Sequence, residues 1–197
     1  MISSLIQETQ LFVDPNFKSC RLRDFPYHNL HHTWQVVGAS TELAQKMKLG
    51  IEEMEILILA AWLHDTGYSV RYQGHEAASQ RIALNFLSQR QFPQENISVV
   101  LRCIQATEMP QKPRSQIEQI ICDADLAHLA SPHFLTLQNK LRLEWDIYLK
   151  KVYPDEEWLV ESLAFLNDHH YHSPYARDNW EEGKKQNSRL LQKQMAS

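Results

Sequence analysis

The chain has 197 residues, of which 43% are hydrophobic and 22% are charged, a composition typical of a water-soluble globular protein with a sizeable core. Its formal net charge of −4 excludes the basic surface expected of a nucleic-acid-binding protein, and no uncharged apolar run is long enough to span a membrane. The N-terminal residues lack the basic region of a signal peptide, and the three cysteines (Cys20, Cys103 and Cys122) form no CxxC motif, which favours reduced thiols. We therefore expect a cytoplasmic protein that binds neither nucleic acid nor membranes.

Apolar residues recur at helical spacing along almost the whole chain, and no stretch shows the alternation of a β-strand. Glycine and proline residues separate these periodic segments, as is typical of helix ends. The predicted helices cover residues 2–12, 33–48, 51–65, 75–90, 93–109, 115–130, 133–153, 155–171 and 174–194. The sequence therefore predicts an all-α fold, a bundle of about eight or nine helices in a single domain over residues 1–197, with residues 2–12 as a short N-terminal flank.

Three of the predicted helices carry histidines or carboxylates at otherwise apolar positions. These residues are His28, His31 and His32 at the start of the second helix, His64 and Asp65 at the end of the third, and Asp123 and Asp125 in the sixth. A divalent cation explains all three placements, because it converts imidazoles and carboxylates that are unfavourable in an apolar interior into ligands. Nitrogen and oxygen ligands suit Mn, Fe, Co, Ni, Zn or Mg. Each piece alone has an ordinary explanation as a core or surface residue, so the prediction rests on their combination.

The segments YHNLHHT (27–33), LAAWLHDTGY (59–68) and ICDADL (121–126), in this order, resemble the motifs of the HD-domain superfamily of metal-dependent phosphohydrolases. The segments GHEAASQ, ATEMPQKP and CDADLAHL resemble a soluble, stand-alone branch of that superfamily. The resemblance covers about residues 25–190 and implies an all-helical fold, at least one divalent metal ion and an activity on nucleotides. It implies four metal ligands, which are His32, His64, Asp65 and Asp125.

The resemblance also implies roles for residues around the ion. His28 matches the general acid that protonates the leaving group in cyclic phosphodiesterases, with a helix cap or another structural role as an equal alternative. Asp123 is expected to support the metal ligands, with a solvent-exposed helix position as the alternative. Glu76 is a candidate for orienting the attacking water, with an ordinary first-turn glutamate as the alternative.

Binuclear members of the superfamily bind a second ion through two additional histidines. His75 matches the first of these positions loosely, but Thr107 and Glu108 stand where the second histidine is expected. This departure favours one ion, with a second ion bound weakly through His75, Glu76 or Glu108 as the alternative. Tyr68 stands where deoxynucleotidase members carry a glutamate, so their catalytic arrangement does not transfer to this chain.

Some basic and aromatic residues are candidates for contacts with an anionic substrate, because arginine, lysine and tyrosine side chains bind phosphate groups. They are Lys112 and Arg114 in PQKPRS, and Tyr171 and Arg177 in the late segment DHHYHSPYARDNW. For all four, a solvated surface position is the stronger alternative.

A cation held by two imidazoles and two carboxylates leaves room for water and a phosphoryl oxygen, lowers the pKa of that water and offsets the charge on phosphorus-bound oxygens. Asp65 or Asp125 would accept the proton of the water, while His28 protonates the leaving oxygen. The predicted activity is hydrolysis of a phosphomonoester or phosphodiester of a small molecule, expected to be a nucleotide, and a homodimer is a candidate assembly. Two alternatives remain: a degenerate HD domain that binds a nucleotide or a protein partner without catalysis, and a di-iron oxygenase of the same fold.

Overall fold

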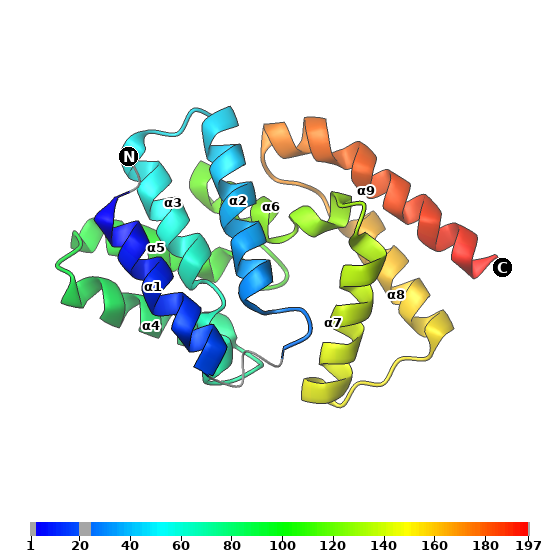
Figure 1. Cartoon of the computed structure of the whole chain (residues 1–197). Coiled ribbons are helices and arrows are strands. Elements are labelled where there is room, and N and C mark those ends of the chain that lie inside the picture. The colour runs from blue at the N-terminus through cyan, green and yellow to red at the C-terminus, as the bar shows by residue number, and fades with distance from the viewer. Residues whose placement is uncertain (1–2, 20–24, 197) are drawn as a thin grey trace. The chain divides into compact units, whose positions relative to one another are not determined.

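A computed structural model describes residues 3–19 and 25–196, with only the backbone for residues 15–19 (Figure 1). The described residues form α1 (Ser4–Ser19), α2 (Leu30–Lys46), α3 (Ile51–Leu63), η2 (Thr66–Ser69), α4 (His75–Gln89), α5 (Gln94–Ala106), α6 (Gln116–Asp125), η3 (Ala127–Ala130), α7 (Phe134–Leu149), α8 (Asp155–Asp168) and α9 (Pro174–Met195), where η denotes a 3-10 helix. No β-strand occurs within these ranges, and the predicted all-α fold is confirmed.

The chain divides into two compact units, Met1–Asp125 and Leu126–Ser197. The first unit contains α1 to α6 together with η2, and the second contains η3 and α7 to α9. The single-domain organisation over residues 1–197 stays a prediction.

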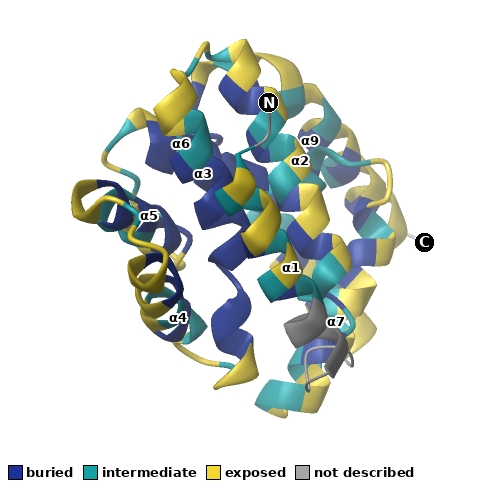
Figure 2. Cartoon of the chain, turned by 60° about the vertical axis from the view of Figure 1, so that its left-hand side comes forward, coloured by how far each residue is buried: buried dark blue, intermediate teal, exposed yellow. Residues whose placement is uncertain are grey.

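Helix α3 is the central helix of the first unit. All eight residues from 56 to 63 are buried, and the helix contacts α1, α2, α4, α5 and α6 (Figure 2). A helix that is apolar on every side is stable only when neighbours cover it on every side, which these five helices do. It is much too short to be a membrane span, and no helix in the described residues combines the length and apolarity needed to cross a membrane.

The second unit has a core of its own, formed by Leu129, Phe134, Leu166 and Leu191. Helix α9 contacts both η3 and α8. The buried Asn187 amide of α9 donates hydrogen bonds to the carbonyl oxygens of Leu129 (2.8 Å) and Ser131 (2.9 Å), which ties α9 to the η3 turn.

The observed helices follow the predicted ranges to within about three residues at most ends, and three differences are larger or change the element. The predicted helix 115–130 is two elements, because Leu126 (φ −97°, ψ 15°) leaves the helical conformation after Asp125 and a short 3-10 helix follows. The predicted helix 133–153 ends at Leu149, since Lys150 adopts a left-handed conformation (φ 55°). Helix α1 extends to Ser19 rather than to residue 12, and its predicted first residue, Ile2, lies outside the described residues.

The thiols of Cys103 and Cys122 are free and buried, as expected for reduced cysteines. Cys20 lies outside the described residues.

Candidate metal centre

The three motif segments meet at helix ends within the first unit. His64 immediately follows α3, Asp65 comes next, and Asp125 is the last residue of α6. His32 lies in the first turns of α2. These ends come together because α2, α3 and α6 contact one another.

Asn29 fixes the start of α2 and with it the direction of His32. Its side-chain Oδ1 accepts hydrogen bonds from the backbone N–H groups of His31 (2.9 Å) and His32 (3.3 Å), and its amide donates to the carbonyls of Phe25 and Pro26. Asparagine is among the best residues for this N-cap position. As a result the helix begins so that His32 is buried, at 4% exposed, while His31 next to it is exposed.

The imidazole of His64 is held in one tautomer by the backbone of its own helix. Its Nδ1 lies 2.9 Å from the carbonyl oxygen of Ala61, and a carbonyl can only accept, so Nδ1 carries the hydrogen. In the neutral ring the lone pair is therefore on Nε2, the atom that faces the carboxylates of Asp65 and Asp125. Metal-bound histidines are commonly oriented by such a second hydrogen bond.

The side chains of the four predicted metal ligands lie next to one another. The Nε2 atom of His32 lies 3.1 Å from Asp125 Oδ1 and 3.5 Å from Asp65 Oδ2, and the Nε2 atom of His64 lies 3.2 Å from Asp65 Oδ2 and 3.6 Å from Asp125 Oδ1. Atoms that bind one ion at about 2.0–2.2 Å lie about 2.8–3.6 Å from one another in tetrahedral or octahedral geometry. These four separations fall in that range. The ligand atoms of His32, His64 and Asp125 lie close enough together to hold one cation, and Asp65 Oδ2 lies beside both histidines.

Two of these atoms also lack a hydrogen-bond partner in the described residues. His64 Nε2 and Asp65 Oδ2 are both buried from solvent, and when the His64 ring is neutral they face each other at 3.2 Å with no hydrogen between them. A buried polar atom without a partner is unfavourable by about 1–3 kcal/mol, and more for a charged group. A cation between them removes that penalty, and the atoms of His32, His64 and Asp125 all lie within 4.8 Å of one another, close enough to share it.

The pKa shifts of His64, Asp65 and Asp125 also show that the cluster favours a bound positive charge. Burial alone would lower the pKa of His64, but the carboxylates of Asp65 and Asp125 outweigh it and raise this pKa well above its usual range. Burial would likewise raise the pKa of both carboxyl groups, but the neighbouring histidines lower the pKa of Asp65 and of Asp125 well below the usual range. Both aspartates are therefore carboxylates, and a cation in the site would replace the proton on His64.

Asp65 also contacts a third histidine with its other oxygen. The Nε2 atom of His75 lies 3.3 Å from Asp65 Oδ1, and its Nδ1 lies 3.6 Å from the carboxylate of Glu76. The ring of Tyr68 stacks on His75 at a centroid distance of 3.8 Å and an interplanar angle of 13°. His75 and Glu76, both sequence candidates, thus lie beside the four predicted ligands on the side of Asp65 Oδ1.

Gly67 allows the turn after Asp65 to approach the start of α4 closely. Its N–H donates to the hydroxyl of Ser79 (2.8 Å), and a Cβ atom at this position would lie 1.9 Å from the carbonyl oxygen of His75. Only glycine fits at that distance. The contact sets the position of His75 relative to Asp65.

His28 lies against the same cluster. Its ring centroid is 4.6 Å from Tyr68, 4.7 Å from Tyr27 and 5.5 Å from His32. Burial would raise the pKa of Asp65, and His28 adds a smaller lowering effect to those of His64 and His75. The helix cap of α2 is Asn29 rather than His28, which removes the capping alternative for this histidine.

The remaining candidates of the first unit are Asp123, Glu108, Lys112 and Arg114. Asp123 is completely buried in α6, so the solvent-exposed alternative for it is wrong. Glu108 is exposed after the end of α5, where its carboxylate accepts a hydrogen bond from the Gln105 amide. Lys112 and Arg114 are exposed and line the same pocket as Glu108.

Tyr171 and Arg177 belong to the second unit. Tyr171 is only 2% exposed and packs edge-on against His169 (4.7 Å) and Trp180 (5.6 Å). This packing favours a structural role for the phenol over the expected substrate contact. Arg177 is exposed on α9.

Sequence reasoning missed the structural contributions of Tyr68 and Asn29. The ring of Tyr68, which is 7% exposed, packs against both His28 and His75, whereas the sequence singles out this position only because a glutamate is missing there. Asn29 could have been found, since an asparagine just before a helical pattern is a standard N-cap signal. The stacking of Tyr68 has no comparable local signal.

An all-helical protein in which imidazoles and carboxylates from three helix ends converge on one buried point is a candidate divalent-metal protein. The family profile of the HD domain matches residues 29–130, just over half of the chain, and the protein belongs to that family. The match covers His32, His64, Asp65 and Asp125 and begins one residue after His28. Neither the curated proteins nor the solved structures contain a match to this chain.

Proposed function

We propose that this protein is a metal-dependent phosphohydrolase that cleaves a phosphomonoester or phosphodiester of a small molecule. The observation that carries the proposal is the convergence of His32, His64, Asp65 and Asp125, with His64 Nε2 and Asp65 Oδ2 buried and lacking hydrogen bonds. Membership of the HD-domain family supports it. The choice of a nucleotide as the substrate rests on the motif resemblance alone.

The donor set suits a hard or borderline cation such as Mn, Fe, Co, Ni, Zn or Mg, because it contains nitrogen and oxygen and no thiolate. When bound, such an ion would lower the pKa of water and stabilise negative charge on a phosphoryl group. The carboxylates of Asp65 and Asp125 would hold it together with the Nε2 atoms of His32 and His64.

Asp65 is suited to a second task, since its Oδ1 faces His75 while its Oδ2 faces the cluster. A proton released from water at the site can be accepted by Asp65 and shared with His75 Nε2. The carboxylate of Glu76 would stabilise the resulting imidazolium, because it lies 3.6 Å from His75 Nδ1. We assign the role of general base to this group of three residues.

His28 is proposed as the general acid. It is half-buried and packs beside His32 and Tyr68, and its ring centroid lies 6.3 Å from that of His75, so it borders the candidate metal centre. Histidine titrates in the pH range that suits proton donation to a leaving oxygen.

Metal content and phosphate release test the proposal together. Protein purified without chelator is expected to contain about one divalent ion per chain and to release phosphate from a panel of nucleotides and p-nitrophenyl phosphates. The double variant His64→Ala with Asp65→Ala is expected to lose both metal and turnover, while His31→Ala, the exposed neighbour of a ligand, should keep both.

Each other outcome has a clear meaning. Stoichiometric metal without turnover on any phosphoester would favour a binding protein, and two iron atoms per chain would favour the oxygenase alternative. Full activity in the double variant would show that the site is wrongly assigned.

A further inference from the structure

A pocket with a volume of about 450 Å³ lies where the end of α5 and the turn after it meet the start of α6. Three basic side chains line it, Arg102, Lys112 and Arg114, and apolar atoms of Ala106 and Pro110 lie among them. None of the residues that line the pocket belongs to the metal centre. The volume is in the range that holds small-molecule ligands.

The acidic residues of this pocket are already engaged. Glu118, which is 4% exposed, accepts a hydrogen bond from the backbone N–H of Arg114 (2.6 Å) and lies 3.6 Å from Nε of Arg102. Glu108 accepts from the amide of Gln105.

The side chains of Lys112 and Arg114 have no acidic partner among the described residues. Both are exposed, and Arg114 engages Glu118 only through its backbone N–H. In a chain with a net charge of −4, this pocket therefore presents two unpaired positive charges over an apolar wall. Such an arrangement attracts anions from solution.

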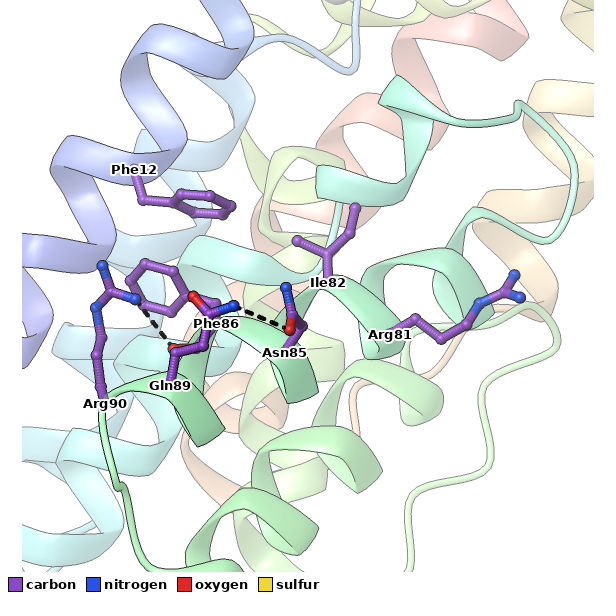
Figure 3. Close-up of a pocket in the computed structure, with 7 residues that line it drawn as sticks. All are labelled: Phe12, Arg81, Ile82, Asn85, Phe86, Gln89 and Arg90. Carbon is purple, nitrogen blue, oxygen red and sulfur yellow. Dashed lines mark hydrogen bonds between the residues drawn. The ribbon is translucent and has the colours of Figure 1, made fainter.

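A second pocket of the same unit, between α1 and α4, differs in this respect. Figure 3 shows Phe12 of α1 over Phe86 of α4, with Arg90 beside them. Arg90 is already paired with the carboxylate of Glu8 (2.9 Å) and lies 3.6 Å above the ring of Phe86. Glu8 and Arg90 hold α1 on α4, and Arg81 is the other basic residue that lines this pocket. Among the described residues this pocket therefore offers one unpaired basic side chain, whereas the α5–α6 pocket offers two.

We propose that the α5–α6 pocket binds an organic phosphate, with Lys112 and Arg114 on the phosphate and the apolar wall against the organic part. Ammonium and guanidinium groups form charge-assisted hydrogen bonds with phosphate oxygens, and guanidinium can do so through two N–H groups. Binding in this pocket is separate from the proposed hydrolysis, because it requires neither a metal ion nor turnover.

Two kinds of molecule could supply the organic phosphate. It is either a separate ligand or a phosphate-bearing part of a molecule that also reaches the metal centre. The experiment distinguishes them with a variant of the metal centre.

Calorimetric titration of the full chain with adenosine 5′-monophosphate, and with adenosine as the ligand that lacks the phosphate, tests the proposal. The nucleotide is expected to bind and adenosine to bind much more weakly. Lys112→Ala with Arg114→Ala should weaken nucleotide binding by at least about tenfold, since each lost charge-assisted hydrogen bond contributes about that factor. Both side chains are exposed, and the backbone bond from Arg114 to Glu118 is unaffected, so the fold is kept.

The matched control is Arg81→Ala with Lys140→Ala, which removes the same charge from two exposed helical positions elsewhere. It should bind the nucleotide as the wild type does. Glu108→Gln should tighten nucleotide binding by about two- to fivefold, because it removes a negative charge that repels the phosphate from the rim of the pocket. Equal binding of nucleotide and adenosine, no binding by the wild type, or an unchanged affinity in the Lys112/Arg114 variant would overturn the proposal.

The His64→Ala variant identifies the source. Unchanged nucleotide binding in this variant supports a separate ligand, while weakened binding in both this variant and the Lys112/Arg114 variant supports one molecule that contacts both sites.

Discussion

His32 and His31 provide a matched pair for a test of the metal centre. They are neighbours in the first turns of α2, but His32 Nε2 lies 3.1 Å from Asp125 Oδ1 and 3.5 Å from Asp65 Oδ2, while His31 is exposed. Replacing either residue with alanine removes one imidazole from the same helix end. Only His32→Ala removes a predicted metal ligand.

The expected effect follows from linkage between metal binding and folding. A metal ion at about 100 times its Kd stabilises the folded state by about 2.7 kcal/mol. For a chain of this size that stabilisation raises Tm by about 5–10 °C. Loss of one ligand is expected to weaken binding by at least about 100-fold, which at the same metal concentration leaves a shift of about 1 °C.

The assay is thermal unfolding of chelator-treated wild type and both variants, each measured with and without added Mn, Co, Ni, Zn or Mg. Comparing each variant with itself cancels any change that the substitution makes to the metal-free fold. The wild type and His31→Ala should show the full shift, and His32→Ala should show almost none. Equal shifts in the two variants, or no shift in the wild type with any of these ions, would refute the assignment.

Further predictions concern the residues around the candidate metal centre. The shift in Tm on adding metal should increase with pH, because a proton on His64 competes with the cation. That proton is fully bound below about pH 6.5 and is lost as the pH rises through the raised pKa of His64. A shift independent of pH would contradict this. Gly67→Ala should lower the unfolding free energy by about 2–4 kcal/mol and weaken metal binding, since its Cβ would lie 1.9 Å from the His75 carbonyl oxygen; denaturant unfolding with wild-type stability would show that the turn relaxes freely. Tyr68→Leu should reduce turnover more than Tyr68→Phe, which keeps the ring stacked on His75, and equal rates would assign no role to the stacking. His75→Ala should keep one tightly bound ion by elemental analysis, whereas a fall from two ions to one would place His75 at a second metal site.

The fold was predictable because its helices are amphipathic or wholly apolar. The run from Ile56 to Leu63 is apolar on every side, and the structure places it at the centre of the first unit. The break after Asp125 was not predictable, because the apolar pattern of residues 115–130 continues through it. Helix ends are the least certain part of any prediction from sequence pattern.

The histidines and aspartates that come together at the candidate site could be predicted from the sequence, but the residues around them could not. The ligand residues stand out in the sequence because histidine and aspartate are unexpected in apolar segments. The contact of His75 with Asp65, in contrast, depends on the close approach of Gly67 to Ser79, twelve positions along the chain, and leaves no periodic signal. Stacking of Tyr68 on His75 depends on the same approach.

The end of α3 explains how two adjacent residues can face one point. Neighbouring side chains within a helix point about 100° apart, so His64 and Asp65 could not converge inside one. His64 keeps helical geometry (φ −57°, ψ −39°), but Asp65 (φ −102°, ψ 3°) has left it. This change of backbone brings Asp65 Oδ2 to 3.2 Å from His64 Nε2 and leaves Oδ1 facing His75. Because the two oxygens belong to one rigid carboxylate, a cation held by Oδ2 would also fix the position of Oδ1 against His75 Nε2.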